Sequence, residues 1–287
     1  MSVDILQEKI RKTKSPIIVD LAVKPEQIPG HIWEGKSQAE AMDLFCRELM
    51  VGLKGKVSGV RFSFDQWALL GALDTLSALT KYAQEQGFYA LLDGPAVLSP
   101  WAAERAASIF DAESGYACDS MVLCPYIGSD AIKPFLPYCK NGKSVFFAVR
   151  SANKSSAELQ DMIAGSRLVH VAAADHVKRH GEALLGKFAY SQVAVLTAAT
   201  NANAVMGLRS KFKNLFLLVD GLDYPGGNGK NCSYGFDRFG HGCAISVGPA
   251  ITAAWTAEGC DGTDYVELAV QAAERIRSNM SRYVTIL

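Results

Sequence analysis

The stretch Phe88–Pro100, FYALLDGPAVLSP, joins a short apolar run to a turn and a helix start. The run ends at Asp93, where a Gly-Pro pair interrupts it. An apolar run of this length between turn signals is typical of a buried parallel strand. Ser99 can cap the helix that follows, and Pro100 suits its first position. In α/β barrels the loops that follow the C-terminal ends of such strands hold the catalytic residues, so Asp93 is a candidate site residue.

Strand-like and helix-like segments alternate in the same way along the whole chain. Helical periodicity is clearest over 37–53, 67–86 and 263–281, and an N-terminal helix is expected over about 1–14. Eight strand–helix units without a break in composition favour a single (β/α)8 TIM barrel with parallel strands over residues 1–287, and a three-layer open sheet is the alternative. The eight predicted strands are 16–22, 57–62, 88–93, 119–123, 143–149, 192–196, 215–219 and 243–246.

A glycine-rich stretch, 220–242, follows the seventh predicted strand. We expect it to form a long loop over the barrel mouth, because long loops at that end of a barrel are usually functional. Its backbone N–H groups, with Lys230 and Arg238, could hold a phosphate. The other interpretation is a flexible surface loop.

Composition excludes several classes of function. The chain has 29 basic and 29 acidic residues, so charge favours neither nucleic acid nor an anionic membrane as partner. No apolar run approaches the ~18 residues that span a bilayer. The first fifteen residues mix charges and predict no export signal. The seven scattered cysteines fit reduced thiols in the cytosol rather than a disulfide framework, so we predict a cytoplasmic protein.

Neither a metal nor a cofactor is expected from the residue pattern. No cysteine pair has the C-x-x-C spacing of zinc sites. His176 and His180 are four residues apart on a predicted helix but lack the glutamate of the metalloprotease pattern, so we interpret them as surface imidazoles.

The order of these segments and several short strings resemble the orotidine 5'-phosphate decarboxylases, particularly their longer bacterial subfamily. The resemblance covers about residues 16–260 and implies a role by descent in pyrimidine nucleotide biosynthesis. It also implies a small phosphorylated ligand, such as a pyrimidine nucleotide, and a homodimer formed through the open ends of the strands. The supporting strings are Gly59-Val60-Arg61-Phe62, Leu91-Leu92-Asp93, Cys124-Pro125-Tyr126-Ile127-Gly128, Ser151-Ala152-Asn153, Pro225-Gly226-Gly227 and Ser246-Val247-Gly248.

The departures from the family pattern lie at its chemical positions. The family's signature is Asp-x-Lys-x-x-Asp. This chain has its first aspartate as Asp93, but it has Pro95 at the lysine position and Leu98 at the position of the second aspartate. The family's lysine on the second strand is Arg61. By the same resemblance, Ala22 stands at the position of the family's first-strand aspartate, and Val247 at that of its phosphate-binding arginine. Pro225 stands at the position of the glutamine before the paired glycines. Ala152 replaces the serine that faces the pyrimidine, and Cys124 replaces the asparagine before Pro125.

These losses bear directly on the reaction. Decarboxylation leaves a carbanion-like centre, and the resemblance implies that an ammonium group stabilises and then protonates it. Proline offers neither charge nor proton, and a guanidinium is a very poor proton donor. One hypothesis is therefore a barrel with a degenerate site that binds a phosphorylated ligand or a protein. The other is a working decarboxylase, or a related carbon–carbon lyase, that uses Arg61 and Asp93.

The candidate site residues follow from the resemblance and from the strand ends. Arg61 and Asp93 are the candidate catalytic pair. Two structural alternatives stay open: Asp93 is simply a polar strand end that caps the next turn, or Arg61 and Asp93 form a purely structural charge pair. Other polar residues near predicted strand ends are Asp20, Arg150, Asp220 and Asp223. The candidate substrate- and phosphate-binding residues are Ser151, Asn153, Gly226, Gly227, Ser246 and Gly248.

Overall fold

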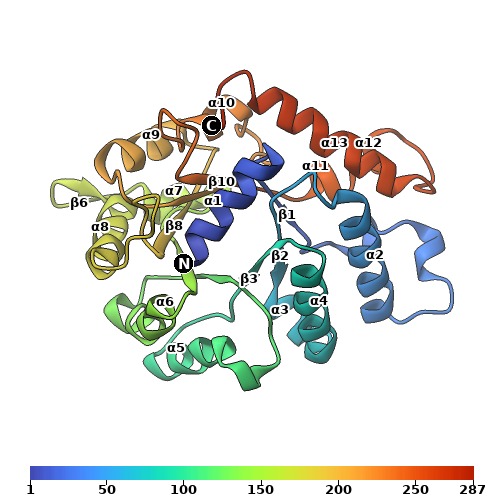
Figure 1. Cartoon of the computed structure of the whole chain (residues 1–287), viewed down its shortest axis with the longest axis horizontal. Coiled ribbons are helices and arrows are strands. Elements are labelled where there is room, and N and C mark those ends of the chain that lie inside the picture. The colour runs from blue at the N-terminus through green and yellow to red at the C-terminus, as the bar shows by residue number, and fades with distance from the viewer.

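A computed structural model describes all 287 residues and contains a closed barrel of eight parallel strands (Figure 1). Neighbouring strands follow the order β1-β10-β9-β8-β5-β4-β3-β2 around the barrel. The predicted (β/α)8 fold is confirmed, and each predicted strand overlaps an observed one. The strands are β1 (Ile17–Asp20), β2 (Gly59–Ser63), β3 (Tyr89–Asp93), β4 (Ser120–Leu123), β5 (Ser144–Ala148), β8 (Val193–Ala198), β9 (Leu217–Asp220) and β10 (Cys243–Val247).

Helices form a ring outside the strands, and their apolar faces build the larger core between the two layers (Figure 1). The predicted helix 67–86 is two helices, because the chain turns at Gly71 with a φ of +65° that suits glycine. The helices are α1 (Ser2–Thr13), α2 (Gln38–Leu53), α3 (Phe64–Leu69), α4 (Leu73–Glu85), α5 (Pro100–Ala107), α6 (Leu136–Lys140), α7 (Ala157–Gln160), α8 (Val169–Gly181), α9 (Ala202–Lys211), α10 (Gly229–Ser233), α11 (Pro249–Thr252), α12 (Ala254–Ala257) and α13 (Tyr265–Met280).

Local signals set the helix starts as the sequence predicted. Ser99 accepts a hydrogen bond from the Ala102 N–H at 3.1 Å, and Pro100 is the first residue of α5. Ser37 caps α2, and Glu40 accepts from the Ser37 N–H at 2.8 Å, which makes a capping box. A two-stranded hairpin of β6 (Ile163–Ala164) and β7 (Arg167–Leu168) lies between β5 and α8 and was not predicted.

The N-terminal helix α1 closes one end of the barrel (Figure 1). Its Val3, Leu6 and Ile10 belong to the buried cluster that also holds inward side chains of the strands, such as Tyr89 and Phe146. Ser2 completes this end, since its Oγ lies 2.7 Å from the Tyr89 hydroxyl. The opposite end, where the strands terminate, is therefore the open mouth of the barrel.

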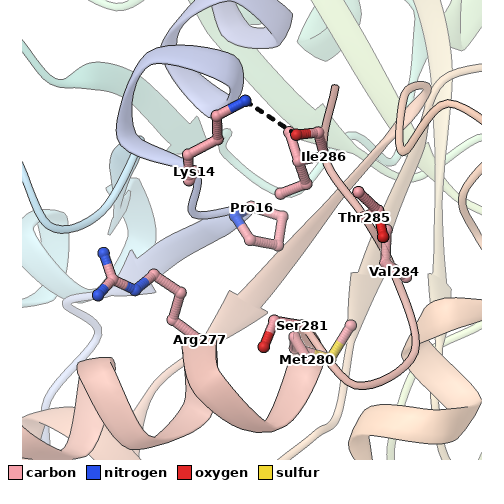
Figure 2. Close-up of a pocket in the computed structure, with 8 residues that line it drawn as sticks. All are labelled: Lys14, Pro16, Arg277, Met280, Ser281, Val284, Thr285 and Ile286. Atoms are coloured by element: carbon pink, nitrogen blue, oxygen red, sulfur yellow. Dashed lines mark hydrogen bonds between the residues drawn. The ribbon is translucent and has the colours of Figure 1, made fainter.

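The C-terminal tail lies at the closed end. Lys14 Nζ donates to the carbonyl of Ile286 at 2.9 Å, and Arg11 Nε donates to that of Leu287 at 2.8 Å. A cavity of about 180 Å³ lies between this tail, Pro16 and the end of α13 (Figure 2). The tail thus packs beside α1, far from the mouth.

The expectation that residues 220–242 form a loop over the mouth is wrong for their second half. Only the first part lines the mouth, where Tyr224 and Pro225 border its cavities. Residues 229–233 form α10, which packs on α9 and α13. The Gly242 N–H donates to Gln7 of α1 at the closed end. The stretch must run this far because each crossover returns the chain to the start of the next parallel strand.

No helix of the structure is both long and apolar enough to span a bilayer.

Candidate active site

Arg61 lies at the centre of the barrel mouth. It points inward from β2, and its side chain is only 8% exposed. Its Nε donates to Asp93 Oδ1 at 2.9 Å, and its Nη2 lies 2.8 Å from Asp93 Oδ2. This is the bidentate geometry in which an arginine–carboxylate pair is strongest. The two predicted catalytic residues are therefore in direct contact.

Two further aspartates and a serine complete the surroundings of the guanidinium. Its Nη1 donates to Asp220 Oδ2 at 3.2 Å and to Ser246 Oγ at 2.9 Å, and it lies 3.7 Å from Asp20 Oδ2. Alternation along the strands explains why these side chains meet. Each of Asp20, Asp93 and Asp220 stands two residues after an apolar residue of the barrel interior and so faces inward as well.

The charge balance in this cluster shifts several pKa values. Burial raises the pKa of Asp93 to about 6, although the Arg61 charge opposes the shift. Burial also raises the pKa of Asp20. Burial alone would lower the pKa of Arg61, but Asp93, Asp20 and Asp220 raise it well above its usual value. The guanidinium therefore stays protonated, and the cluster holds three carboxylates around one cation.

Beside the cluster lies a cavity of about 430 Å³ bordered by the ends of β1, β9 and β10. Asp20, Asp220 and Asp223 line it, together with Lys24 and Gly248. Asp223 Oδ2 accepts from the Gly248 N–H at 2.7 Å, while its buried Oδ1 has no partner. Burial raises the pKa of Asp223 to about 6 despite the hydrogen bond from the Gly248 N–H group.

A second cavity, of about 540 Å³, is lined by residues that follow the ends of β5 and β8, and it shares Tyr224 and Pro225 with the first cavity. Arg150, Asn153 and Thr200 line it. Arg150 is buried and already paired. Its Nε and Nη2 bind the two oxygens of Asp161 at 3.0 and 2.9 Å, and its Nη1 donates to Thr200 Oγ1 at 3.3 Å.

A third cavity, of about 300 Å³, lies over Asp93 and Arg61 and is lined by Pro95 and Cys124. Leu98, further along the same loop, is 83% exposed. The two residues that the resemblance assigns to the signature's lysine and second aspartate are thus a proline ring at the site and an exposed leucine side chain. Neither can supply a charge to the mouth.

The predicted binding residues divide into two groups. Asn153 and Gly248 line the mouth cavities. Ser246 binds Arg61, and the Ser151 hydroxyl donates to Asn153 Oδ1 at 2.7 Å, so both hydroxyls have partners within the protein. Gly226 and Gly227 form the turn after Tyr224, and neither lines the two larger cavities of the mouth.

Two positional expectations at the mouth need correction. The carboxylate that reaches Arg61 from the first strand is Asp20, whereas Ala22 lies beyond the end of that strand. Val247, assigned to the phosphate-binding arginine, is the last residue of β10 and packs in the outer core. It points away from the mouth because it alternates with the inward-facing Ser246, so no side chain at 247 could hold a ligand there.

Period-two alternation could have corrected the assignment of Val247, because it places this side chain outside the barrel. It could not have separated Asp20 from Ala22, which alternation puts on the same face; only the end of β1 at Asp20 does so. The partnership of Arg150 with Asp161 had no such signal. These residues are eleven positions apart and meet only because the chain folds back after β5.

Relatives with known names share the length of this chain. It is 26% identical over 264 residues to an orotidine 5'-phosphate decarboxylase of Caldicellulosiruptor bescii, covering 85% of this chain and 86% of the relative. It is 26% identical over 287 residues to one of Clostridium kluyveri, covering 98% and 97%. The Plasmodium berghei orotidine 5'-monophosphate decarboxylase structure matches with a TM-score of 0.77 at 13% identity, covering 98% of each chain. No protein-family profile matches the chain.

The fold and the site define a single-domain parallel (β/α)8 barrel with a charged cluster in its mouth. Sequence similarity then relates the chain to one family. Along most of its length it is similar to orotidine 5'-phosphate decarboxylases, as the sequence strings predicted.

Proposed function

We propose that this protein is a family member that no longer decarboxylates orotidine 5'-phosphate efficiently and instead binds a phosphorylated ligand, such as a pyrimidine nucleotide, in its mouth. One observation carries the proposal. The centre of the site holds one guanidinium fully engaged by protein acceptors, and the loop position beside it is Pro95.

The chemistry supports a loss of turnover. A carbanion-like centre needs a positive group that can also give up a proton. The carboxylates around Arg61 raise its pKa well above its usual value, so they make it an even poorer proton donor. The loss of one preorganised stabilising group typically lowers a rate by about 10²–10³-fold. Asp93, held by Arg61 through both oxygens, has the contacts of a structural ion pair.

The mouth supports ligand binding. Its two larger cavities, about 540 and 430 Å³, fall in the range of about 300–1,000 Å³ usual for small-molecule sites. Asn153, Lys154 and Thr200 offer polar groups on one side, and Lys24 and Gly248 on the other. Lys24 and Lys154 take part in no ion pair, so they can face an anionic group.

We also infer that two copies pair through this end, as the family resemblance implies, and that the protein works in the cytosol. Large apolar side chains are exposed after the strand ends, including Leu98 at 83% and Trp101 at 70%. Trp101→Glu should convert a dimer into a monomer in light scattering. Val51→Glu, at a 61%-exposed position on α2, is the matched control and should leave the mass unchanged.

The test of function combines binding and turnover on one sample. Uridine monophosphate is titrated by calorimetry, and orotidine monophosphate is then followed by loss of orotate absorbance. We expect binding without turnover above the rate seen without protein. Turnover that Asp93→Asn abolishes would instead establish the alternative, an enzyme that uses Arg61 and Asp93. If neither nucleotide binds, the proposed ligand is wrong and a protein partner becomes the better candidate.

A further inference from the structure

Two histidines of α8 converge on one hydroxyl outside the barrel mouth. His176 and His180 are one helical turn apart, and their Nε2 atoms each lie 3.3 Å from Ser129 Oγ. Ser129 belongs to a short 3₁₀ turn, η5 (Gly128–Ala131), which follows β4. The two imidazole centroids are 5.1 Å apart, with the rings nearly perpendicular. Two side chains of one helix and one side chain of a distant loop thus meet at a point.

The Ser129 hydroxyl can pair with both imidazoles, because its oxygen has two acceptor lone pairs and one proton to donate. The tautomer of each ring decides whether its Nε2 donates to this oxygen or accepts its proton. In a neutral imidazole that carries its proton on Nδ1, the Nε2 lone pair can bind a cation instead. Two Nε2 atoms that face one point can therefore share a cation.

A neutral imidazole has a free lone pair and is the common ligand of transition-metal ions. Lys133 is the one positive side chain that acts on His180, and its charge must weaken the binding of any cation.

We propose that His176 and His180 form a binding site for a divalent transition-metal ion of the Zn²⁺ or Ni²⁺ class. The two Nε2 atoms are the protein ligands, at the usual 2.0–2.1 Å. The Ser129 hydroxyl binds the ion or one of its waters, and water fills the remaining positions. This proposal replaces our sequence-based expectation that the two imidazoles carry no metal. No third histidine, cysteine or carboxylate joins them, so the site is exchangeable rather than a closed structural one.

The metal would connect parts of the chain that the fold brings together only at this point. Ser129 precedes α6 and His176 lies in α8, so the ion would link the crossover after β4 to the one after β5. This link predicts a higher unfolding temperature with metal, because an ion that binds the folded chain in preference to the unfolded one stabilises the folded state.

The experiment is a calorimetric titration of the full chain with Zn²⁺ and, separately, with Ni²⁺. The background is Cys124→Ser/Cys260→Ser, since these two exposed thiols could also bind the ions. We expect one ion per chain. His176→Gln and His180→Gln should each weaken binding at least about tenfold, because even indirect partners of a metal are worth 10–100-fold in affinity. His31→Gln, which changes an exposed imidazole elsewhere in the chain, should leave binding unchanged.

Lys133→Gln provides the opposite control, since loss of the nearby charge should tighten binding. It also separates metal binding from a folding defect, because a damaged site cannot bind more tightly. The proposal fails if neither ion binds the background protein, or if His176→Gln and His180→Gln bind like it. It also fails if His31→Gln lowers affinity as much as they do.

Discussion

Arg61 and Asp93 are joined by two nearly parallel hydrogen bonds, at 2.9 Å from Nε to Oδ1 and 2.8 Å from Nη2 to Oδ2. The pair sits on neighbouring strands of the barrel, β2 and β3. Because Asp20 and Asp220 also approach the same guanidinium, one cation keeps three carboxylates together at the mouth. Removing that cation should be far more damaging than removing any single aspartate.

The first prediction concerns this cation. Arg61→Ala leaves buried carboxylates without compensation and should lower the free energy of unfolding by on the order of 3–5 kcal/mol. Urea denaturation at pH 7.5 measures the loss. The matched control is Lys178→Ala, which breaks an exposed pair with Glu182 one helical turn away and should cost less than about 1 kcal/mol. Equal losses in the two variants would show that the cluster is not held by Arg61.

The second prediction concerns pH. The pKa of Asp223 is about 6 in the folded chain, above its unfolded value, so the folded state binds more protons between these two values. The contribution of Asp223 to stability is therefore greatest at low pH and falls as pH rises through about 6. Asp223→Asn keeps an acceptor for the Gly248 N–H but cannot ionise.

The variant should therefore gain stability relative to the parent between pH 4.5 and 7.5, by on the order of 1–2 kcal/mol. Denaturation curves of both proteins at the two pH values give this difference directly. A constant gap between them would contradict the raised pKa of Asp223.

The third prediction concerns the turn beside Pro225. A β-carbon at Gly227 would lie 1.9 Å from the carbonyl oxygen of Gly221, so the backbone must move to accept it. Gly227→Ala should lower the free energy of unfolding by about 1–3 kcal/mol. Gly207, exposed on α9 with no atom near such a β-carbon, is the control, and Gly207→Ala should raise it by about 0.5–1 kcal/mol. Thermal or urea unfolding that gives both variants the same sign would rule out this account of the turn.

The fourth prediction tests whether α1 is part of the folded domain. Leu6 is fully buried against the strands at the closed end, while the adjacent Ile5 is 40% exposed. Leu6→Ala should cost about 2–5 kcal/mol in unfolding free energy. Ile5→Ala should change it by no more than about 1 kcal/mol. If both substitutions are neutral in urea denaturation, α1 does not stabilise the barrel.

Short-range patterns in the sequence were enough to predict the barrel. Apolar runs between turn residues mark strands such as Phe88–Asp93, and caps such as Ser99-Pro100 mark helix starts, because both signals act within a few residues. The pairing of Arg61 with Asp93 was also within reach, since consecutive strands of a barrel lie side by side. The family strings pointed to the same proteins to which the chain is similar along most of its length.

The tertiary structure decided how many carboxylates share Arg61. The barrel closes by pairing β10 with β1, and β9 lies next to β10, which puts Asp220 and Ser246 beside the guanidinium of Arg61. It likewise decided that the stretch after Asp220 leaves the mouth and descends to Gln7, and that Arg150 binds Asp161. Local propensity cannot report such contacts. They depend on strand register and on the paths of loops, which are set by the packing of segments far apart in the chain.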